Sequence, residues 1–133
     1  MKPSNETMLH FYQQLGRVFF GVAEADGTVR EEEIERLDEI VQKHWLGLED
    51  TFDEFDTDSA YQIEIVFAWL NNNDWDKDNI LEDFKDFKEE HSKLFGYKNR
   101  LLIQGTAQAI AKSFYGTNKA ENLYLNDLRK ILE

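Results

Sequence analysis

Apolar residues recur every three or four positions along almost the whole chain, which is the spacing of one face of an α-helix. Strand-like alternation of apolar and polar residues is not sustained in any window. The pattern therefore predicts an all-α fold, a single compact bundle of about six to seven helices. The expected helices cover residues 5–24, 30–45, 59–71, 79–94, 98–115 and 120–132, with a further short helical turn between residues 48 and 55.

Local signals indicate where these helices begin and end. Gly27 suits the left-handed position that ends the first helix. Three pairs of residues have the spacing of a capping box, in which an N-cap residue and the residue three positions later bond to each other's backbone amides. These pairs are Thr28 with Glu31, Ser59 with Gln62, and Asn79 with Glu82.

The helix expected at 98–115 has the fewest charges and contains small residues, among them Gly105, Ala109 and Ala111. Small residues allow neighbouring helices to approach closely. We therefore expect this helix at the centre of the bundle.

Composition narrows the class of protein further. The 133 residues contain 15 Lys and Arg against 27 Asp and Glu, for a formal net charge of -12, and no Cys. This size fits one domain spanning residues 1–133, and the lack of Cys excludes a disulfide scaffold and thiol catalysis. The acidic surplus argues against nucleic-acid binding. Neither a secretory leader nor a long apolar run is apparent, so we expect a cytoplasmic protein without membrane insertion.

Two segments resemble degenerate copies of one helical hairpin. Residues 21–28 and 109–117 each contain small apolar residues with Ala, reach a Gly-Thr pair, and lead into an amphipathic helix. On this alignment, the apolar stripe from Ile34 to Val41 matches the stripe from Leu125 to Leu132. A duplicated hairpin is one interpretation. The other is that any helical hairpin has Gly at its turn.

Residues 25–34, Ala-Asp-Gly-Thr-Val-Arg-Glu-Glu-Glu-Ile, resemble the signature of the TerB-like domain, an all-helical module named after tellurite-resistance proteins. The helix before this segment and the apolar stripe after it also look like that family. The resemblance implies a small cytoplasmic helical domain of the stress-response type, in which acids of the motif bind a divalent cation. Asp26 and Glu33 are the matching acids.

The chain departs from the TerB-like pattern in its second half. The family repeats Asp-Gly there, whereas this chain has Tyr115-Gly116, and Glu121 or Asn122 stands where the second Glu would be. A metal site that requires both copies of the motif is therefore not expected to be intact.

The residues of this first motif indicate metal binding even without the resemblance to the TerB-like family. Asp26 at a helix end and Glu33 one turn into the next helix place two carboxylates near each other, and Ca²⁺, Mg²⁺ or Mn²⁺ prefers such oxygen ligands. We take Asp26, Glu33 and Glu32 as the candidate metal ligands. The alternative is structural: Asp26 caps the turn, and the acids after Arg30 oppose the positive end of the helix dipole.

Two other acidic stretches have competing interpretations. Residues 74–81 place acids at positions one, three and five, as a calcium loop does, but Lys85 replaces the bidentate Glu and Asn79 replaces Gly, so an Asx-rich turn is favoured. Residues 49–58 interleave six acids with Phe52 and Phe55. They could form a docking segment for a basic partner, or a solvated loop with both rings in the core.

Catalysis has little support in this sequence. His10, His44 and His91 lie on three different expected helices without metal-binding or catalytic spacing, and no phosphate-binding glycine loop is present. We therefore expect a non-enzymatic binding module with a protein partner and a divalent cation bound at the Asp26-Gly27 turn. The first alternative is a metal-free module whose acidic face docks a basic partner. A carboxylate-based hydrolase is the distant second alternative.

Overall fold

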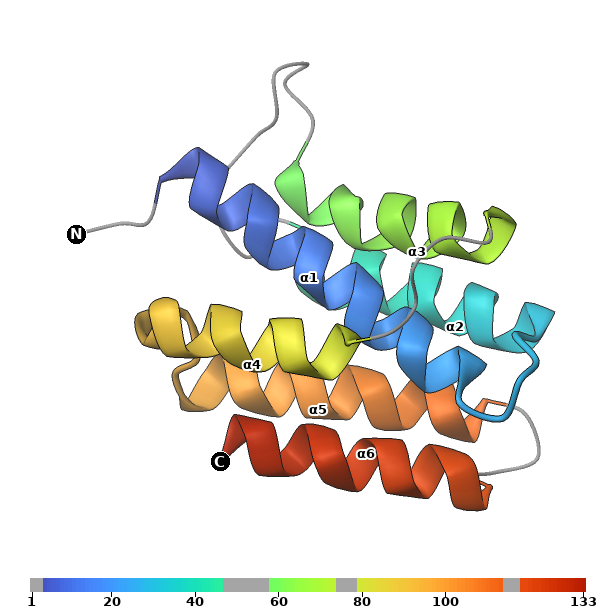
Figure 1. Cartoon of the computed structure of the whole chain (residues 1–133). Coiled ribbons are helices and arrows are strands. Elements are labelled where there is room, and N and C mark those ends of the chain that lie inside the picture. The colour runs from blue at the N-terminus through green and yellow to red at the C-terminus, as the bar shows by residue number, and fades with distance from the viewer. Residues whose placement is uncertain (1–3, 47–57, 74–78, 114–117) are drawn as a thin grey trace.

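The computed structural model describes residues 4–46, 58–73, 79–113 and 118–133, which form a bundle of α-helices (Figure 1). The helices are α1 (Asn5–Glu24), α2 (Glu31–Ile40), α3 (Gln62–Asn72), α4 (Ile80–Glu90), α5 (Tyr97–Lys112) and α6 (Lys119–Leu132). A π-helical turn (Val41–Trp45) continues α2, and 3-10 turns precede α3 (Ser59–Tyr61) and follow α4 (Ser92–Leu94). The all-α prediction is confirmed. The short turn expected between residues 48 and 55 lies outside the described residues.

Helix α1 is the central element of the bundle. It packs against α3 on one side and against α4, α5 and α6 on the other, as Figure 1 shows, while α2 packs on α5. Its apolar residues are almost all fully buried, which is why its hydrophobic stripe is so wide. Helix α5 was expected at the centre because of its small residues. It packs against α1, α2 and α6, and Ala109 is partly buried against the core, but a Cβ on Gly105 would meet no atom within 4 Å, so this glycine does not bring another helix close.

Two glycines of α1 make its central position possible. A Cβ on Gly16 would lie 2.8 Å from the carbonyl oxygen of Ile63, so α3 crosses α1 at that point. A Cβ on Gly21 would overlap the phenol ring of Tyr124, whose hydroxyl donates a hydrogen bond of 3.1 Å to the Val18 carbonyl. Small residues therefore bring α3 and α6 close to α1, as they do at other close helix crossings.

Among the described residues, the largest fully buried side chain is that of Trp45, at the end of the π-helical turn. Its ring contacts those of Phe11, Tyr12 and Phe19 on α1. Its indole nitrogen donates a hydrogen bond of 3.2 Å to the hydroxyl of Thr106 on α5. Buried indole groups need such a partner, and this one ties the end of α2 to α5.

Helix ends agree only in part with the sequence. Gly27 adopts φ +89, as expected for the residue after α1. The predicted Thr28–Glu31 capping box was wrong: the Thr28 amide donates to Asp26, and the N-cap of α2 is Arg30, two residues later. The chain therefore completes an Asx turn before α2 starts, which moves the cap forward.

The other two predicted capping boxes are also absent. Asp58, not Ser59, caps the 3-10 turn before α3, because its carboxylate accepts a hydrogen bond from the Ala60 amide. Asn79 precedes α4 in the left-handed conformation, with φ 63, and makes no side-chain cap. A left-handed residue turns its side chain away from the first helical amides, so the pairing with Glu82 does not form.

A few large apolar side chains are exposed in the described part of the chain: Ile65 and Trp69 on α3, Tyr97 and Leu101 on α5, and Leu123 on α6. Among the helices of these ranges, none combines the length and the hydrophobicity that a membrane span requires.

Candidate functional site at the joint between two hairpins

The carboxylate of Asp26 lies where the α1–α2 and α5–α6 hairpins meet. It accepts hydrogen bonds from Nη1 of Arg30 (2.7 Å), from the side-chain amide of Asn118 (2.7 Å) and from the backbone amide of Thr28 (3.1 Å). The Arg30 hydrogen bond is the main cause of a lowered Asp26 pKa, which burial opposes in part. Asp26 is therefore an ionised carboxylate with its acceptors occupied.

Beside Asp26, the first turns of α2 and α6 are built in the same way. The backbone amide of Arg30 donates to Oε1 of Glu33 (2.8 Å), and the backbone amide of Asn118 donates to Oε1 of Glu121 (3.2 Å). Each glutamate is the third residue of its helix and satisfies an amide that the helix leaves unpaired. Asn118 and Glu121 therefore form the capping box that the sequence analysis missed.

These two glutamates are both buried and lie close to each other. Glu33 is 1% exposed and Glu121 is 2% exposed. Burial raises the pKa of Glu33 to about 7, and the Glu121 carboxyl raises it as well, whereas the Arg30 amide and guanidinium act in the opposite direction.

The matching caps support the duplicated-hairpin interpretation and correct its register. Arg30 corresponds to Asn118 and Glu33 to Glu121, so Leu37 matches Leu125 rather than Leu128. The sequence alignment followed the apolar stripes and was therefore displaced by one helical turn. A helical stripe repeats about every turn, so it defines a face but not the position along it.

The structure brings together two of the three candidate metal ligands. The carboxylates of Asp26 and Glu33 converge on the guanidinium of Arg30, with Nη1 at 2.7 Å and 4.0 Å from their oxygens. Glu32 is exposed on the outer side of α2 and contributes no contact at this position. Over the four described ranges, no three His, Cys, Asp or Glu side chains are grouped so that they could hold a metal ion.

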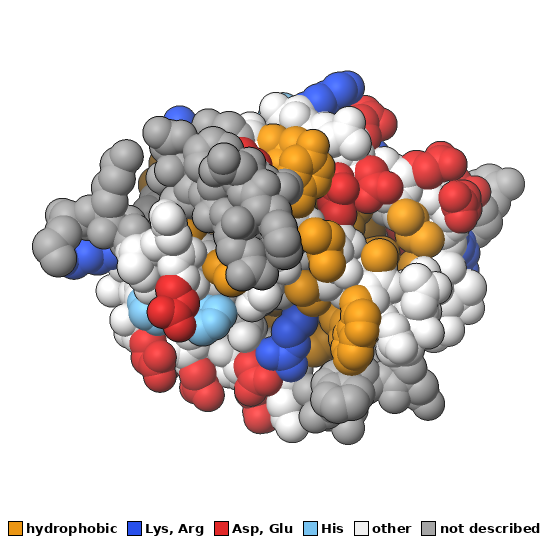
Figure 2. All heavy atoms as spheres, turned by 90° about the horizontal axis from the view of Figure 1, so that it is seen from above, with side chains coloured by type: hydrophobic (Ala, Val, Ile, Leu, Met, Phe, Trp, Pro, Cys, Tyr) orange, Lys and Arg blue, Asp and Glu red, His pale blue; other side chains and the backbone are white. Residues whose placement is uncertain are grey.

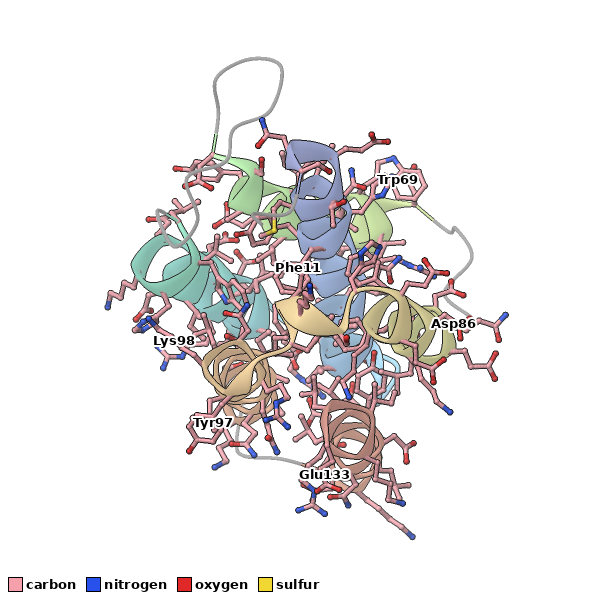
Figure 3. All side chains as sticks on the ribbon, turned by 90° about the vertical axis from the view of Figure 1, so that its left-hand side faces the viewer. Phe11, Trp69, Asp86, Tyr97, Lys98 and Glu133 are labelled. Atoms are coloured by element: carbon pink, nitrogen blue, oxygen red, sulfur yellow. The ribbon has the colours of Figure 1, made fainter. Side chains whose placement is uncertain are left out.

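A second candidate surface lies on α3. Ile65 and Trp69, one helical turn apart, are 53% and 45% exposed. Figure 2 views the side of the molecule on which α3 lies and shows hydrophobic side chains near the middle of this side, with acidic and basic side chains beside them. We call the exposed surface of α3, which carries Ile65 and Trp69, and the adjoining carboxylates of α2 the acidic face; Trp69 lies on the side of α3 away from α2 (Figure 3).

The carboxylates of the acidic face are Glu64 on α3 and three residues on α2, Glu31, Glu35 and Asp38. Burial raises the pKa of Glu64 to about 7, and the negative charge of Asp38 adds to this. Burial also raises the pKa of Asp38, with contributions from Glu31 and Glu35. Within the described chain, Oε1 of Glu64 is buried and has no hydrogen-bond partner. The acidic face thus has an unsatisfied carboxylate among repelling charges.

The other residues singled out in the sequence are dispersed. His10 and His44 are exposed, and His91 ends α4 with its ring 4.6 Å from that of Phe87. The described part of the 74–81 stretch begins at Asn79, and of the 49–58 stretch only Asp58 is described. Both interpretations of Phe52 and Phe55 therefore concern residues outside the described ranges.

Comparisons with protein-family models, with curated protein sequences and with solved structures gave no match to this chain.

Proposed function

We propose that this chain is a non-enzymatic protein-interaction module that docks a basic, partly apolar partner on its acidic face. The observation that carries the proposal is the exposure of Ile65 and Trp69, one turn apart on α3, the helix that also carries the partly buried Glu64. An exposed apolar pair with charges around it resembles the centre and rim of a protein interface.

Two energetic terms favour such a partner. Covering Ile65 and Trp69 removes apolar surface from water, at about 25 cal/mol per Å². A Lys or Arg of the partner close to Glu64 and Asp38 would offset the repulsion between these two carboxyl groups. The net charge of -12 also speeds the approach of a cationic partner.

A synthetic amphipathic peptide with Leu at helical spacing and Lys at the other positions tests the proposal. We expect its binding, followed by NMR chemical shifts, to perturb residues of α3, and the double variant Ile65→Ser/Trp69→Ser to weaken it about tenfold or more. The matched control is Tyr97→Ser, because Tyr97 is 71% exposed and lies across the molecule from Trp69 (Figure 3). Equal weakening by both variants would contradict the proposal.

Proton release gives a second, independent readout. A cationic partner favours the ionised form of Glu64, so docking near pH 7 should release protons from the carboxyl group. Calorimetry in buffers of different ionisation enthalpy measures this release. The Glu64→Gln variant should bind without it.

A divalent-cation module is our second proposal, favoured by the convergence of Asp26 and Glu33 on one point. The cation would replace the Arg30 guanidinium between these carboxylates, with Glu121 next to Glu33. The resemblance of residues 25–34 to the TerB-like signature supports this proposal and, with it, a stress-response role in the cytoplasm.

A further inference from the structure

Positive charge is concentrated at the end of this acidic chain. Residues 91–133 contain seven Lys or Arg and three Asp or Glu, whereas residues 1–90 contain eight and 24. Helix α5 carries Lys98, Arg100 and Lys112 and no acidic residue. In Figure 3, Tyr97 and Lys98 at the start of α5 lie across the molecule from Trp69. The described surface thus has a basic side opposite the acidic face.

A groove runs between α2 and α5 on this basic side. It consists of two adjoining cavities of about 220 Å³ and 410 Å³, which share Arg36, Gly105 and Ala109. Apolar side chains, among them Ile40 and Leu101, line the smaller cavity. The charged and titratable residues that line the two cavities are Arg36, His44 and Lys112, so no carboxylate lines them, although Glu39 lies next to Arg36.

Gly105 keeps the floor of the groove open. A Cβ at this position would meet no atom within 4 Å, and the residue lies in the middle of α5 with ordinary helical backbone. Glycine inside a helix is about 0.5–1 kcal/mol less stable than alanine, so neither packing nor backbone conformation within this chain accounts for it. Its effect is to let another chain approach the α5 backbone.

We propose that the groove between α2 and α5 binds an acidic amphipathic helical segment of a partner protein. The apolar side chains of that segment would lie over Gly105 and Leu101, and its carboxylates would pair with Arg36 and Lys112. A helix laid between two others is the ordinary packing of a bundle and a common mode of peptide recognition. Arg36 already pairs with Glu39 at 3.0 Å, but both side chains are more than 40% exposed. Such a pair is weak and exchanges readily.

The probe is a synthetic peptide with Leu at helical spacing and Glu at the other positions. We expect it to bind the full chain and to perturb NMR signals of the residues that line the groove. Gly105→Leu, which fills the floor, and the double variant Arg36→Glu/Lys112→Glu should each weaken binding about tenfold or more. Gly105→Ala adds a single methyl group to the floor and should weaken binding less than Gly105→Leu does.

The proposals for the acidic face and for the groove can be refuted independently, because their peptide probes have opposite charge. The Ile65→Ser/Trp69→Ser variant should bind the Glu peptide normally, and Gly105→Leu should bind the Lys peptide normally. No binding of the Glu peptide, equal binding by wild type and Gly105→Leu, or shifts confined to α3 would overturn the groove proposal. Concentration-dependent self-association that Gly105→Leu abolishes would overturn it too, since the occupant would then be a second copy.

Discussion

The side-chain amide of Asn118 donates a hydrogen bond of 2.7 Å to Oδ2 of Asp26, from the start of α6 to the turn after α1. The same carboxylate holds Arg30, so one side chain connects both hairpins. Asp26 is therefore first a structural residue, which links the ends of two helix pairs that are far apart in sequence.

Replacing Asp26 or Asn118 by alanine should destabilise the fold, and combining the two substitutions should show that their effects are coupled. We expect Asp26→Ala and Asn118→Ala each to lower the free energy of unfolding by about 1–2 kcal/mol. The double variant should lose about 0.5–1.5 kcal/mol less than the two single losses combined, because the shared bond is removed once. Urea unfolding of the four proteins measures this. Strict additivity would show that the two side chains act independently.

The paired carboxyls predict a pH dependence of stability. The folded pKa of Glu33, about 7, exceeds its ordinary value of 4.5, so the protonated form stabilises the fold. This contribution is complete below about pH 4.5 and is lost as the pH rises through 7. We expect Glu33→Gln to flatten the fall in unfolding free energy between pH 4.5 and 8.

Glu64 provides a matched comparison, because its pKa is also raised to about 7 but on the acidic face. Glu64→Gln should flatten the same pH range, and the double variant should be flatter than either. Urea unfolding at several pH values measures how the free energy of unfolding of each variant depends on pH. If Glu33→Gln left this dependence unchanged, Glu33 would already be ionised at low pH in the folded protein.

Replacing Gly21 or Gly105 by alanine should change the free energy of unfolding in opposite directions. Gly21→Ala places a methyl group in the ring of Tyr124 and should destabilise the fold by about 1–3 kcal/mol. Gly105→Ala meets nothing and should stabilise it by about 0.5–1 kcal/mol. Chemical denaturation measures both. Tyr124→Leu should reduce the penalty of Gly21→Ala, and a penalty that persists in full would place the clash elsewhere.

The cation proposal predicts a specific thermal shift. If Ca²⁺, Mg²⁺ or Mn²⁺ replaces the Arg30 guanidinium, a concentration of 100 Kd stabilises the wild type by about 2.7 kcal/mol. Asp26→Asn and Glu33→Gln should respond little, whereas Arg30→Gln should respond at lower cation concentration. Glu32→Gln is the matched control and should behave as the wild type does, because Glu32 is exposed. An equal shift in every variant would indicate general screening of the negative charge.

The helices were predictable because their burial patterns are strong. The stripe of Phe11, Leu15, Val18, Phe19 and Val22 is fully buried, so α1 was found with both its ends. Their arrangement was not predictable from small residues alone. Gly16, Gly21 and Gly105 are alike in sequence, but the first two meet another helix and the third meets solvent. What a glycine faces depends on tertiary packing, which local sequence does not contain.

The candidate site at the joint between the hairpins was likewise only partly predictable from local sequence. Asp26 and Glu33 were found because they are close in sequence, but their partners Asn118 and Glu121 lie in α6 and its cap. An Asn followed three residues later by Glu was a visible capping signal. Its register with Arg30 and Glu33 was hidden, because the apolar stripes align equally well one turn away. The pairing of Glu33 with Glu121 depends on both hairpins being folded together.

The opposite charges of the α3 and α5 sides have a consequence before any contact forms. A molecule whose cations and anions are sorted in this way has an electric dipole in addition to its net charge. In the field of a charged partner, that dipole turns the whole bundle as it diffuses. A basic partner would therefore meet Trp69 first and an acidic one Leu101, which increases the fraction of collisions that are productive.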